Sequence, residues 1–417
     1  MFDNVLFQSA SSLLSDDIAH GTLPGSILLS GPAASGKLTC ALEIARVLSC
    51  NGSVKGDWSC KCSSCQKQKA LVSSNVLLLG PGDRSLEIAA ARNTLLFQNA
   101  NNTNHLEASR YLYLRAVRKL TSRFNPLLWE DDPKLDKFSP LVESINDSLE
   151  QLDPSRALPD GDELQKILDD VEKNASKLED SFLYDALPVL QIRNLSSWAH
   201  LAATEGKRII IIENADRMAD SARNALLKIL EEPPRDTQFI LTTVRRGALL
   251  PTILSRVRTY SFFERTTEQQ QEVIDRVFHY MPNPGEKKPE SIDAFLQKYL
   301  PVKPEIIKQY AVIYFKSISE GHIPNIPSIV KGCGGFDPRT LFRLFIQDII
   351  NAQSSLNKTA AGAESSSQLL EMLRKSYNNV TVYNQNPAAA LEELARNLLM
   401  VNHQNNKIFY TIKFEQA

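Results

Sequence analysis

The sequence lacks the features that mark secreted proteins, membrane proteins and proteins that hold DNA by themselves. Its first 20 residues show no basic start followed by a long apolar core, so no signal peptide is expected. No apolar run approaches the ~20 residues that a membrane-spanning helix needs. The net charge is −1, so the chain has no basic excess for gripping a nucleic acid. We therefore expect a cytoplasmic protein, not bound to a membrane, that shares any nucleic-acid role with partners.

Histidine and cysteine are scarce, but the distribution of the cysteines is informative. The six histidines are scattered and form no metal-binding or catalytic pattern. Of the six cysteines, Cys40 and Cys333 lie apart, and the other four follow the spacing C-x9-C-x-C-x2-C. In a reducing compartment this spacing favours a tetrahedral zinc site, and free thiols are the alternative. The expected ligands of one structural Zn²⁺ are Cys50, Cys60, Cys62 and Cys65.

A phosphate-binding loop is the next motif. An apolar strand is expected over 26–30, followed by GPAASGK, which matches G-x4-G-K between a strand and a helix. Gly31 and Gly36 permit the backbone angles that turn N–H groups toward phosphate. Lys37 would reach the terminal phosphates. The alternative is a turn bounded by two glycines that contains a lysine by chance.

Two replacements indicate that hydrolytic chemistry has been lost. Leu38 stands where a Ser or Thr hydroxyl would bind Mg²⁺, and Thr39 is rotated from that direction by ~100°. Four isoleucines predict a buried parallel strand over 208–212, which ends at Glu213. In nucleotide hydrolases an acid at such a strand end holds Mg²⁺ and a second group orients water. The second position is Asn214, which cannot act as a base, so ATP with Mg²⁺ is either bound without hydrolysis or not bound.

The rest of the chain is expected to alternate strands and helices and then to become mostly helical. A helix is expected after Asp220, and Pro233 and Pro234 end it. After residue 265 the only further strand is expected at 409–414. The remaining strands of the α/β core are expected at 76–79, 238–243 and 260–263.

Residues 84–185 interrupt the α/β pattern with amphipathic segments. One segment, 106–123, is basic, and another, 163–180, is acidic with apolar residues near heptad spacing. One interpretation is a helical hairpin in which these opposite charges pair. The alternative is a contact of the basic helix with DNA or with a protein partner.

Together these motifs resemble the bacterial DNA polymerase III clamp-loader family within the AAA+ class of ATPases. The resemblance covers 1–82 and about 186–262 and leaves out the insert at 84–185. Within the family the likeness is to the delta-prime type, and the alternatives are a gamma/tau-type motor and an unrelated zinc-stabilised P-loop protein. The motifs that carry the resemblance are GPAASGK, the four-cysteine knuckle, LQIRNLSSWAHLAATEGKRIIIIENADRM, NALLKILEEPP and LLPTILSR.

The resemblance implies an α/β AAA+ P-loop core followed by two all-α domains, a lid and a collar. The core carries an inserted zinc knuckle at about 50–65 and a helical insert at about 84–185. The collar is where subunits of such loaders oligomerise. The implied domains are the core over 1–262, the helical lid over 263–330 and the C-terminal helical collar over 331–417.

The resemblance also implies a function. A delta-prime-like stator assembles with delta and gamma/tau subunits and helps to load the sliding clamp on primer–template DNA during replication. It is part of a DNA-directed DNA polymerase (nucleotidyltransferase) holoenzyme without hydrolysing ATP itself. Arg256, in the family's Ser-Arg-Cys position, is implied as an arginine finger for a neighbouring subunit's ATP; the alternative is a local ion pair. The residues of the nucleotide site, working or vestigial, are Gly31, Gly36, Lys37, Thr39 and Glu213.

Overall fold

A parallel five-stranded sheet forms the centre of the N-terminal part of the chain. The strand order is β2-β3-β4-β1-β5, and every pairing is parallel. All residues of β3 and β4 are buried, as expected for central strands that are covered on both faces. The predicted α/β class with a parallel sheet is thereby confirmed. The strands are β1 (Ser26–Ser30), β2 (Val76–Leu79), β3 (Arg208–Ile212), β4 (Thr237–Thr243) and β5 (Arg258–Ser261).

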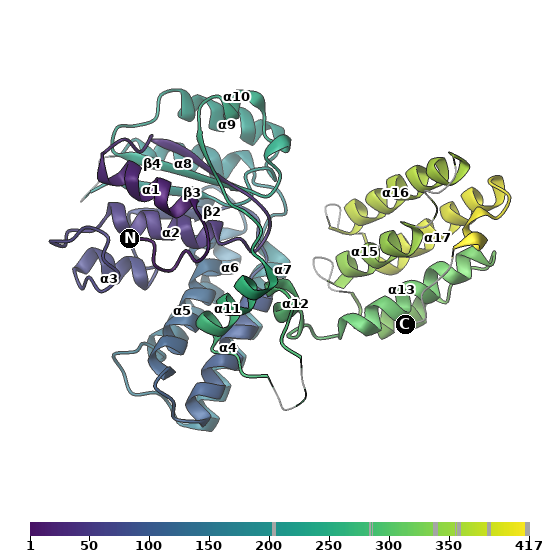
Figure 1. Cartoon of the computed structure of the whole chain (residues 1–417), viewed down its shortest axis with the longest axis horizontal. Helices are drawn as coiled ribbons and strands as arrows, with labels where there is room; N and C mark the ends of the chain where they lie inside the picture. The colour runs from purple at the N-terminus through teal and green to yellow at the C-terminus, as the bar shows by residue number, and fades with distance from the viewer. Residues whose placement is uncertain are drawn as a thin grey trace. The chain divides into compact units, whose positions relative to one another are not determined.

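The computed structural model describes residues 1–201, 206–282, 285, 287–336, 341–354, 356, 360–381 and 385–412. The chain divides into two units, residues 1–296 and residues 297–417. The first unit contains the sheet (Figure 1). Its α-helices outside the insert are α1 (Ala10–Ala19), α2 (Lys37–Leu48), α3 (Ser63–Lys69), α8 (Val189–Ala199), α9 (Asp220–Glu231), α10 (Pro251–Leu254), α11 (Thr267–Phe278) and α12 (Ile292–Gln297), whose last residue lies at the boundary of the second unit.

The isoleucine run of β3 serves two cores because successive strand residues point to opposite faces of a sheet. Ile209 and Ile211 are buried in a cluster with residues of α1 and α2. Ile210 and Ile212 are buried in the larger cluster on the other face, which includes residues of α8, α9 and the insert. The four consecutive isoleucines are thus explained by apolar packing on both faces of the sheet.

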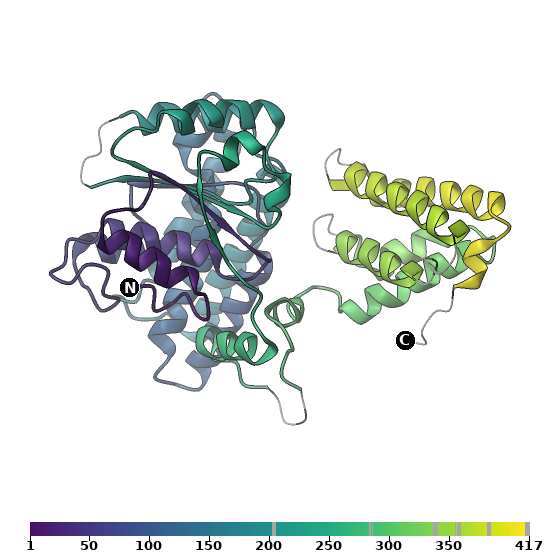
Figure 2. The same cartoon turned by 45° about the horizontal axis from the view of Figure 1, so that its top comes forward.

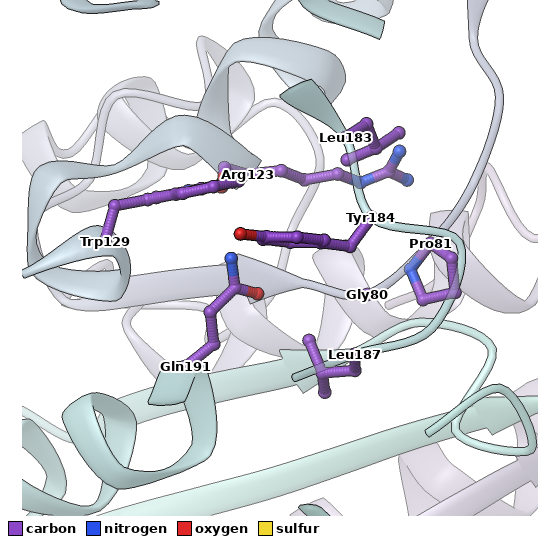
Figure 3. Close-up of a pocket in the computed structure, with 8 residues that line it drawn as sticks. All are labelled: Gly80, Pro81, Arg123, Trp129, Leu183, Tyr184, Leu187 and Gln191. Carbon is purple, nitrogen blue, oxygen red and sulfur yellow. The ribbon is translucent and has the colours of Figure 1, made fainter. Parts of the chain in front are cut away.

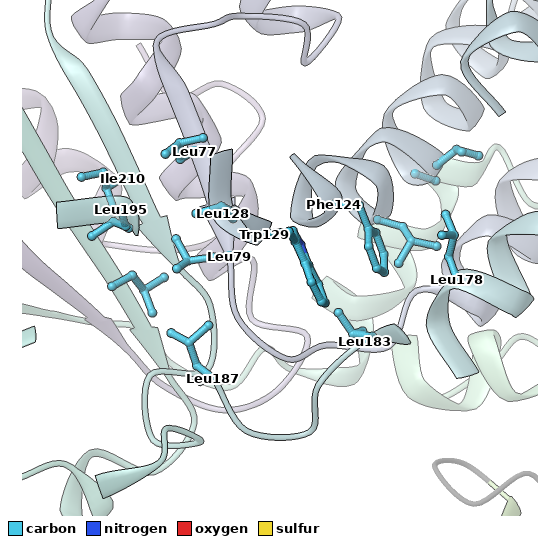
Figure 4. Packing of buried hydrophobic residues seen from close by; sticks show 14 of the residues in the cluster. Leu77, Leu79, Phe124, Leu128, Trp129, Leu178, Leu183, Leu187, Leu195 and Ile210 are labelled. Atoms are coloured by element: carbon cyan, nitrogen blue, oxygen red, sulfur yellow. The ribbon is translucent and has the colours of Figure 1, made fainter. Parts of the chain in front are cut away.

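The insert at 84–185 folds against the same sheet and shares its core. Figure 4 shows Leu77 and Leu79 of β2 beside Leu128 and Trp129 of the insert. Trp129 packs edge-on against Phe138, with ring centroids 4.9 Å apart. The insert is therefore not a separate body. Its elements are α4 (Ser85–Ala100), α5 (Leu106–Thr121), η1 (Ser122–Phe124), η2 (Pro126–Trp129), α6 (Leu135–Gln151) and α7 (Gly161–Phe182).

The predicted charge pairing between the basic and acidic segments is confirmed only in part, because the charges of Arg123 and Glu179 lie close enough to interact. The acidic helix α7 packs against α6, and its Asp169 and Glu172 pair with Arg92 of α4. The cations of α5 bind elsewhere: Arg115, for example, donates to main-chain oxygens of α3. Amphipathic spacing identified the helices, but it could not identify which helix would lie beside which.

The segment after the sheet begins with α11, whose start is fixed by a capping box between Thr266 and Gln269. Figure 1 shows α11 near α4, and the two helices are in contact. The boundary between the two units, at residues 296 and 297, falls inside the expected lid. The division into core, lid and collar stays a prediction.

The second unit is helical in all its described elements. Figure 2 shows its longer helices side by side, and α15 contacts both α13 and α16. The predicted strand at 409–414 is wrong for its described part, because η5 (Ile408–Thr411) forms there; residues 413–414 lie outside the described residues. Within the described chain, no helix combines the length and apolar character that crossing a membrane requires. The helices are α13 (Pro304–Ser319), α14 (Ile326–Gly332), α15 (Leu341–Gln353), α16 (Ala360–Thr381) and α17 (Pro387–Gln404).

Candidate functional site

The predicted phosphate-binding loop connects β1 to the first turn of α2. Ala34 and Gly36 have left-handed φ values of 53° and 93°, which turn successive N–H groups toward one side. A Cβ atom on Gly31 would lie 2.4 Å from the carbonyl oxygen of Phe262, so only glycine fits there. The Lys37 ammonium donates to the Gly31 carbonyl at 2.8 Å and to Ser35 Oγ at 3.2 Å. The lysine therefore lies folded over its own loop.

Two acidic residues lie near Lys37. Burial lowers the pKa of Lys37 to about 8, while the charges of Glu213 and Asp216 act in the opposite direction. Asp216 has a fully buried side chain that accepts from Thr243 Oγ1 at 2.8 Å and from Arg245 Nε at 3.2 Å. Asp216 was not predicted from the sequence, although its position three residues after Glu213 was a usable signal.

The Mg²⁺-binding hydroxyl has no replacement in the loop. Leu38 is buried in the apolar cluster that includes Ile209 and Ile211. Thr39 lies one residue further along α2 and is half-buried. Leu38 thus has a packing role in place of the missing hydroxyl.

Glu213 is held by two arginines of the insert. Arg84 donates to Oε1 and Arg123 donates to Oε2, so both carboxylate oxygens have a guanidinium partner. Burial alone would raise the pKa of Glu213, but the two arginines hold it below its usual value. The adjoining Asn214 donates its side-chain amide to the Pro81 carbonyl at 2.7 Å. These contacts do not fit a resident Mg²⁺, which needs free carboxylate oxygens.

A network of buried charges continues from Glu213 into the insert. Glu87 pairs with Arg84 at 3.1 Å and also with Lys119. Glu179 accepts from the Arg84 main-chain N–H at 2.6 Å and from the Ser85 hydroxyl. Burial, with the nearby charge of Asp83, raises the pKa of Glu179 to about 7. The network joins the start of α4 and the end of α7 to the end of β3.

A small hollow lies beside this network. Figure 3 shows the Arg123 side chain at its edge and the rings of Trp129 and Tyr184, which stack with centroids 5.2 Å apart. Its walls are both polar and apolar and are supplied by the segment after β2, by η1 and η2 in the middle of the insert, by the segment after α7 and by α8. The lining residues are Gly80, Pro81, Arg123, Trp129, Leu183, Tyr184, Leu187 and Gln191.

The four predicted cysteine ligands do come together. Their Sγ atoms all lie within 4.8 Å of one another, a spacing that four thiolates around one tetrahedral metal ion can adopt. A Cβ atom on Gly52 would lie 2.6 Å from Cys60 Sγ, so glycine leaves room for the cluster. Although burial opposes it, main-chain N–H donors lower the pKa of Cys62 to about 6, which favours the thiolate. The cluster is thus suited to hold a metal ion.

Arg46 of α2 links this cluster to the core. Its guanidinium lies 3.5 Å from Cys65 Sγ, donates to the carbonyls of Asp57 and Gly56, and pairs with Glu43 at 2.5 Å. The Arg46 side chain is only 2% exposed. Arg46 was not predicted from the sequence, because no spacing rule connects a helix residue to a later knuckle.

Arg256 follows α10 and pairs with a local acid. It donates to Glu231 Oε1 at 2.6 Å and to the Thr252 carbonyl at 2.7 Å. About a third of its side chain is exposed, and half of the Glu231 side chain is exposed. The structure thus contains the local ion pair that the sequence analysis named as the alternative, and the finger role stays a prediction.

Arg265 also contacts the loop, and the sequence offered no signal for it. It donates to the Ala34 carbonyl at 2.8 Å and to the Leu6 carbonyl at 3.1 Å. The adjacent Phe263 main chain exchanges two hydrogen bonds of 2.9 Å with the Gln8 side chain. The N-terminal segment and the segment after β5 are thereby joined beside the loop.

A family model described as "DNA polymerase III, delta subunit" matches residues 7–128 and 163–266, together more than half of the chain. Only 129–162 of the insert falls between the matched segments. The expectation that all of 84–185 lies outside the family is therefore wrong, because the match includes both arginines that hold Glu213.

Curated relatives match shorter stretches. DNA polymerase III subunit delta' of Bacillus subtilis is 48% identical over 56 residues, 13% of this chain and 17% of its own length. The delta' of Buchnera aphidicola is 30% identical over 101 residues, 24% of this chain and 28% of its own length. Subunit gamma/tau of Mycobacterium bovis is 39% identical over 71 residues, 17% of this chain and 12% of its own length. The matches thus span less than a third of each of these relatives.

A crystal structure of a DNA polymerase III gamma subunit-related protein from Thermotoga maritima aligns with 57% of this chain and 90% of its own. The sequence identity is 18% and the TM-score is 0.27, which is too low to support a shared fold.

Proposed function

The chain belongs to the DNA polymerase III clamp-loader family, and from this premise we propose that it is a delta-prime-like stator subunit of the loader. In this role it assembles with gamma/tau and delta subunits in the cytoplasm. The assembly loads the sliding clamp on primer–template DNA for the polymerase holoenzyme. The single observation that carries the stator role is the occupation of both Glu213 oxygens by Arg84 and Arg123.

Lack of ATP hydrolysis by the chain itself follows from three local features. Leu38 supplies no hydroxyl for Mg²⁺, Asn214 supplies no base, and each oxygen of Glu213 already has a guanidinium partner. Loss of a single group that stabilises a transition state commonly lowers a rate by ~10²–10³. Three such losses make the loop at 31–37 a structural or binding element of an AAA+ P-loop core.

The cysteine cluster is proposed to hold one structural Zn²⁺. Four thiolates fill a tetrahedral site and leave no open position for substrate or water. The knuckle is therefore a stabilising module and not a reaction centre.

The second part of the proposal is that Arg256 acts on the ATP of a neighbouring subunit. Its pairing with Glu231 does not oppose this role, because a partly exposed ion pair contributes only ~0–1 kcal/mol. Arg256 can therefore exchange Glu231 for phosphate oxygens, which a guanidinium binds in a two-pronged geometry. Arginine fingers raise turnover by ~10³–10⁵ in simpler GTPases.

The experiment that tests the stator role begins with purification of the full chain from its source cell and identification of its partners. Recovery with other loader subunits is expected, and recovery without any of them would reject the proposal. A steady-state ATPase assay on the isolated chain then separates a stator from a motor. This assay is needed because one of the relatives, 39% identical over 71 residues, is a gamma/tau subunit. Turnover that Lys37→Ala abolishes would identify a motor subunit.

Arg256 is tested in the assembled loader. Arg256→Ala should assemble normally and lose clamp- and DNA-stimulated ATP hydrolysis at one site. The matched control is Arg276→Ala, which removes another exposed arginine of the first unit that pairs with an acid, Glu272. Equal turnover in both variants would show that Arg256 has no role in hydrolysis.

A further inference from the structure

We propose that Arg84 and Arg123 take the place of a divalent cation at Glu213, so that any phosphate held by the loop at 31–37 is bound without metal. The two guanidinium groups are delivered by the insert, Arg84 from the residue before α4 and Arg123 from η1. Each binds a different oxygen of the carboxylate. A metal ion at this carboxylate would have to displace at least one of them.

The side chains of Arg84, Arg123 and Glu213 are largely buried, which stabilises the ion pairs that take the place of the metal. The exposed fractions are 1% for Arg123, 14% for Arg84 and 12% for Glu213. A buried carboxylate without a counter-charge strongly destabilises the folded state, and so does removal of one partner of a buried pair. The arginines therefore have the charge-compensating role that a metal ion has in a hydrolase. This need explains why Glu213 is present in a site that lacks the other catalytic groups.

Two glycines, Gly80 and Gly82, lie next to Glu213 and leave space around it. A Cβ atom on Gly82 would lie 2.9 Å from Arg123 Nη2 and 3.1 Å from Glu213 Oε2. A Cβ atom on Gly80 would lie 2.1 Å from the Glu213 carbonyl oxygen. A side chain at position 82 would thus press on the Arg123–Glu213 pair, and one at position 80 would press on the main chain at the end of β3. Gly82 therefore leaves the room that the pair needs.

The surrounding charges keep the arrangement balanced. The other groups that face it are Glu87, which pairs with Arg84 and Lys119, and Glu179, which accepts from the Arg84 main chain. Asp83 adds a further negative charge near Glu179. A divalent cation added beside the two resident arginines would meet two positive charges, whereas the same cation replacing one arginine would meet only one.

The inference goes beyond the proposed function, because it assigns a role to the insert and is tested on the isolated chain. Failure of the chain to join a clamp loader would leave it unaffected. The test measures urea unfolding of the full chain with its zinc bound, with and without millimolar Mn²⁺ as the only added ligand. Arg84→Gln frees Oε1 of Glu213, and the double variant Arg84→Gln, Glu213→Gln removes the acid as well. The matched control is Arg258→Gln, which breaks an arginine–carboxylate pair with Asp17 at β5.

Mn²⁺ should raise the unfolding midpoint of Arg84→Gln and leave the wild type, the double variant and Arg258→Gln unchanged. The apparent Mn²⁺ affinity of Arg84→Gln should be at least ~10-fold tighter than that of the wild type, since one oxygen and one charge are released. An equal response of the wild type, no response of Arg84→Gln, or a response that persists without Glu213 would each overturn the proposal.

If Arg84→Gln does not fold, the wild type still decides the question. Titration of Mn²⁺ followed by electron paramagnetic resonance should show no binding to the wild-type chain. A bound Mn²⁺ ion that is lost in Glu213→Gln would show that the arginines do not exclude metal, and it would overturn the proposal.

Discussion

Two groups of metal-ligating side chains in the first unit are compensated in opposite ways. At the knuckle, four sulfur atoms lie within 4.8 Å of one another, and among them Cys65 has a guanidinium, that of Arg46, 3.5 Å away. At the end of β3, one carboxylate, Glu213, is held by two guanidinium groups. The difference shows that ligand chemistry alone does not make a metal site. Neighbouring segments decide whether a cation from solution or a cation of the chain itself compensates the charge.

The largest effect is expected at the knuckle, where one metal ion would compensate four thiolates. Cys65→Ser should lower the zinc content from one ion per chain to nearly none and reduce stability by several kcal/mol. Structural zinc contributes ~10–16 kcal/mol in small zinc-finger peptides, and less is expected where α2 and α3 already pack on a core. Metal analysis and urea unfolding measure both quantities. The control, Cys40→Ser, alters a buried thiol outside the cluster and should keep the metal.

The next largest effect on the free energy of unfolding is expected at Glu213, whose carboxylate is paired with two arginines. Arg123→Met leaves Glu213 with an uncompensated oxygen and should cost ~3–5 kcal/mol of unfolding free energy. Adding Glu213→Gln should recover much of that loss, because it removes the stranded charge. Urea unfolding of the wild type, of Arg123→Met, of Glu213→Gln and of the double variant completes the double-mutant cycle. Independent, additive effects of the two substitutions would show that the pair is not coupled.

A smaller effect should appear in the pH dependence of stability. The pKa of Glu179 is raised to about 7 from 4.5, so the folded chain binds a proton there that the unfolded chain releases near pH 4.5. This contribution is fully present below pH 4.5 and is lost as pH rises through 7. Between pH 5 and 8 the free energy of unfolding should fall by at most ~3 kcal/mol. Glu179→Gln should flatten that fall, and an unchanged profile would contradict the assignment.

The smallest of these effects tests Arg46, which lies beside Cys65. Arg46→Gln should weaken metal binding by ~10–100-fold, because groups that bond to metal ligands tune their affinity to about that extent. Competition with a chelator measures the affinity, and the Co²⁺ absorption spectrum reports whether the sulfur geometry is retained. The control is Lys69→Gln, which removes another cation stacked on Trp58. Equal losses in both variants would assign the effect to the ring contact.

The sequence predicted the strands well because continuous apolar runs leave few alternatives inside a sheet. The expected strands at 26–30, 76–79 and 208–212 match β1, β2 and β3, while β5 begins two residues before the predicted 260. The strand expected at 409–414 was wrong because Phe409 is buried against Phe315 in a helical unit. Apolar residues signal burial there, but the partner that buries them decides the local conformation.

At the candidate site, motifs identified the groups that lie close together in sequence, and packing determined the others. The loop and the four cysteines were predictable because their spacing is short. Arg84 and Arg123 reach Glu213 from positions 129 and 90 residues away, and no local pattern carries that information. The pairing of Arg256 with Glu231 was named only as a general alternative, since the acid lies on a different helix.

The position of the insert affects how readily the edge of the sheet can pair with another chain. The insert leaves the sheet after β2, which is the last strand at one side of the order, and its η1 segment lies against that strand. An edge strand with open main-chain groups can recruit a strand from another chain and so begin aggregation. Because η1 lies against β2, the insert hinders the pairing of a strand from another chain with this edge. An insert at this position can therefore lengthen the protein without promoting aggregation through the sheet edge.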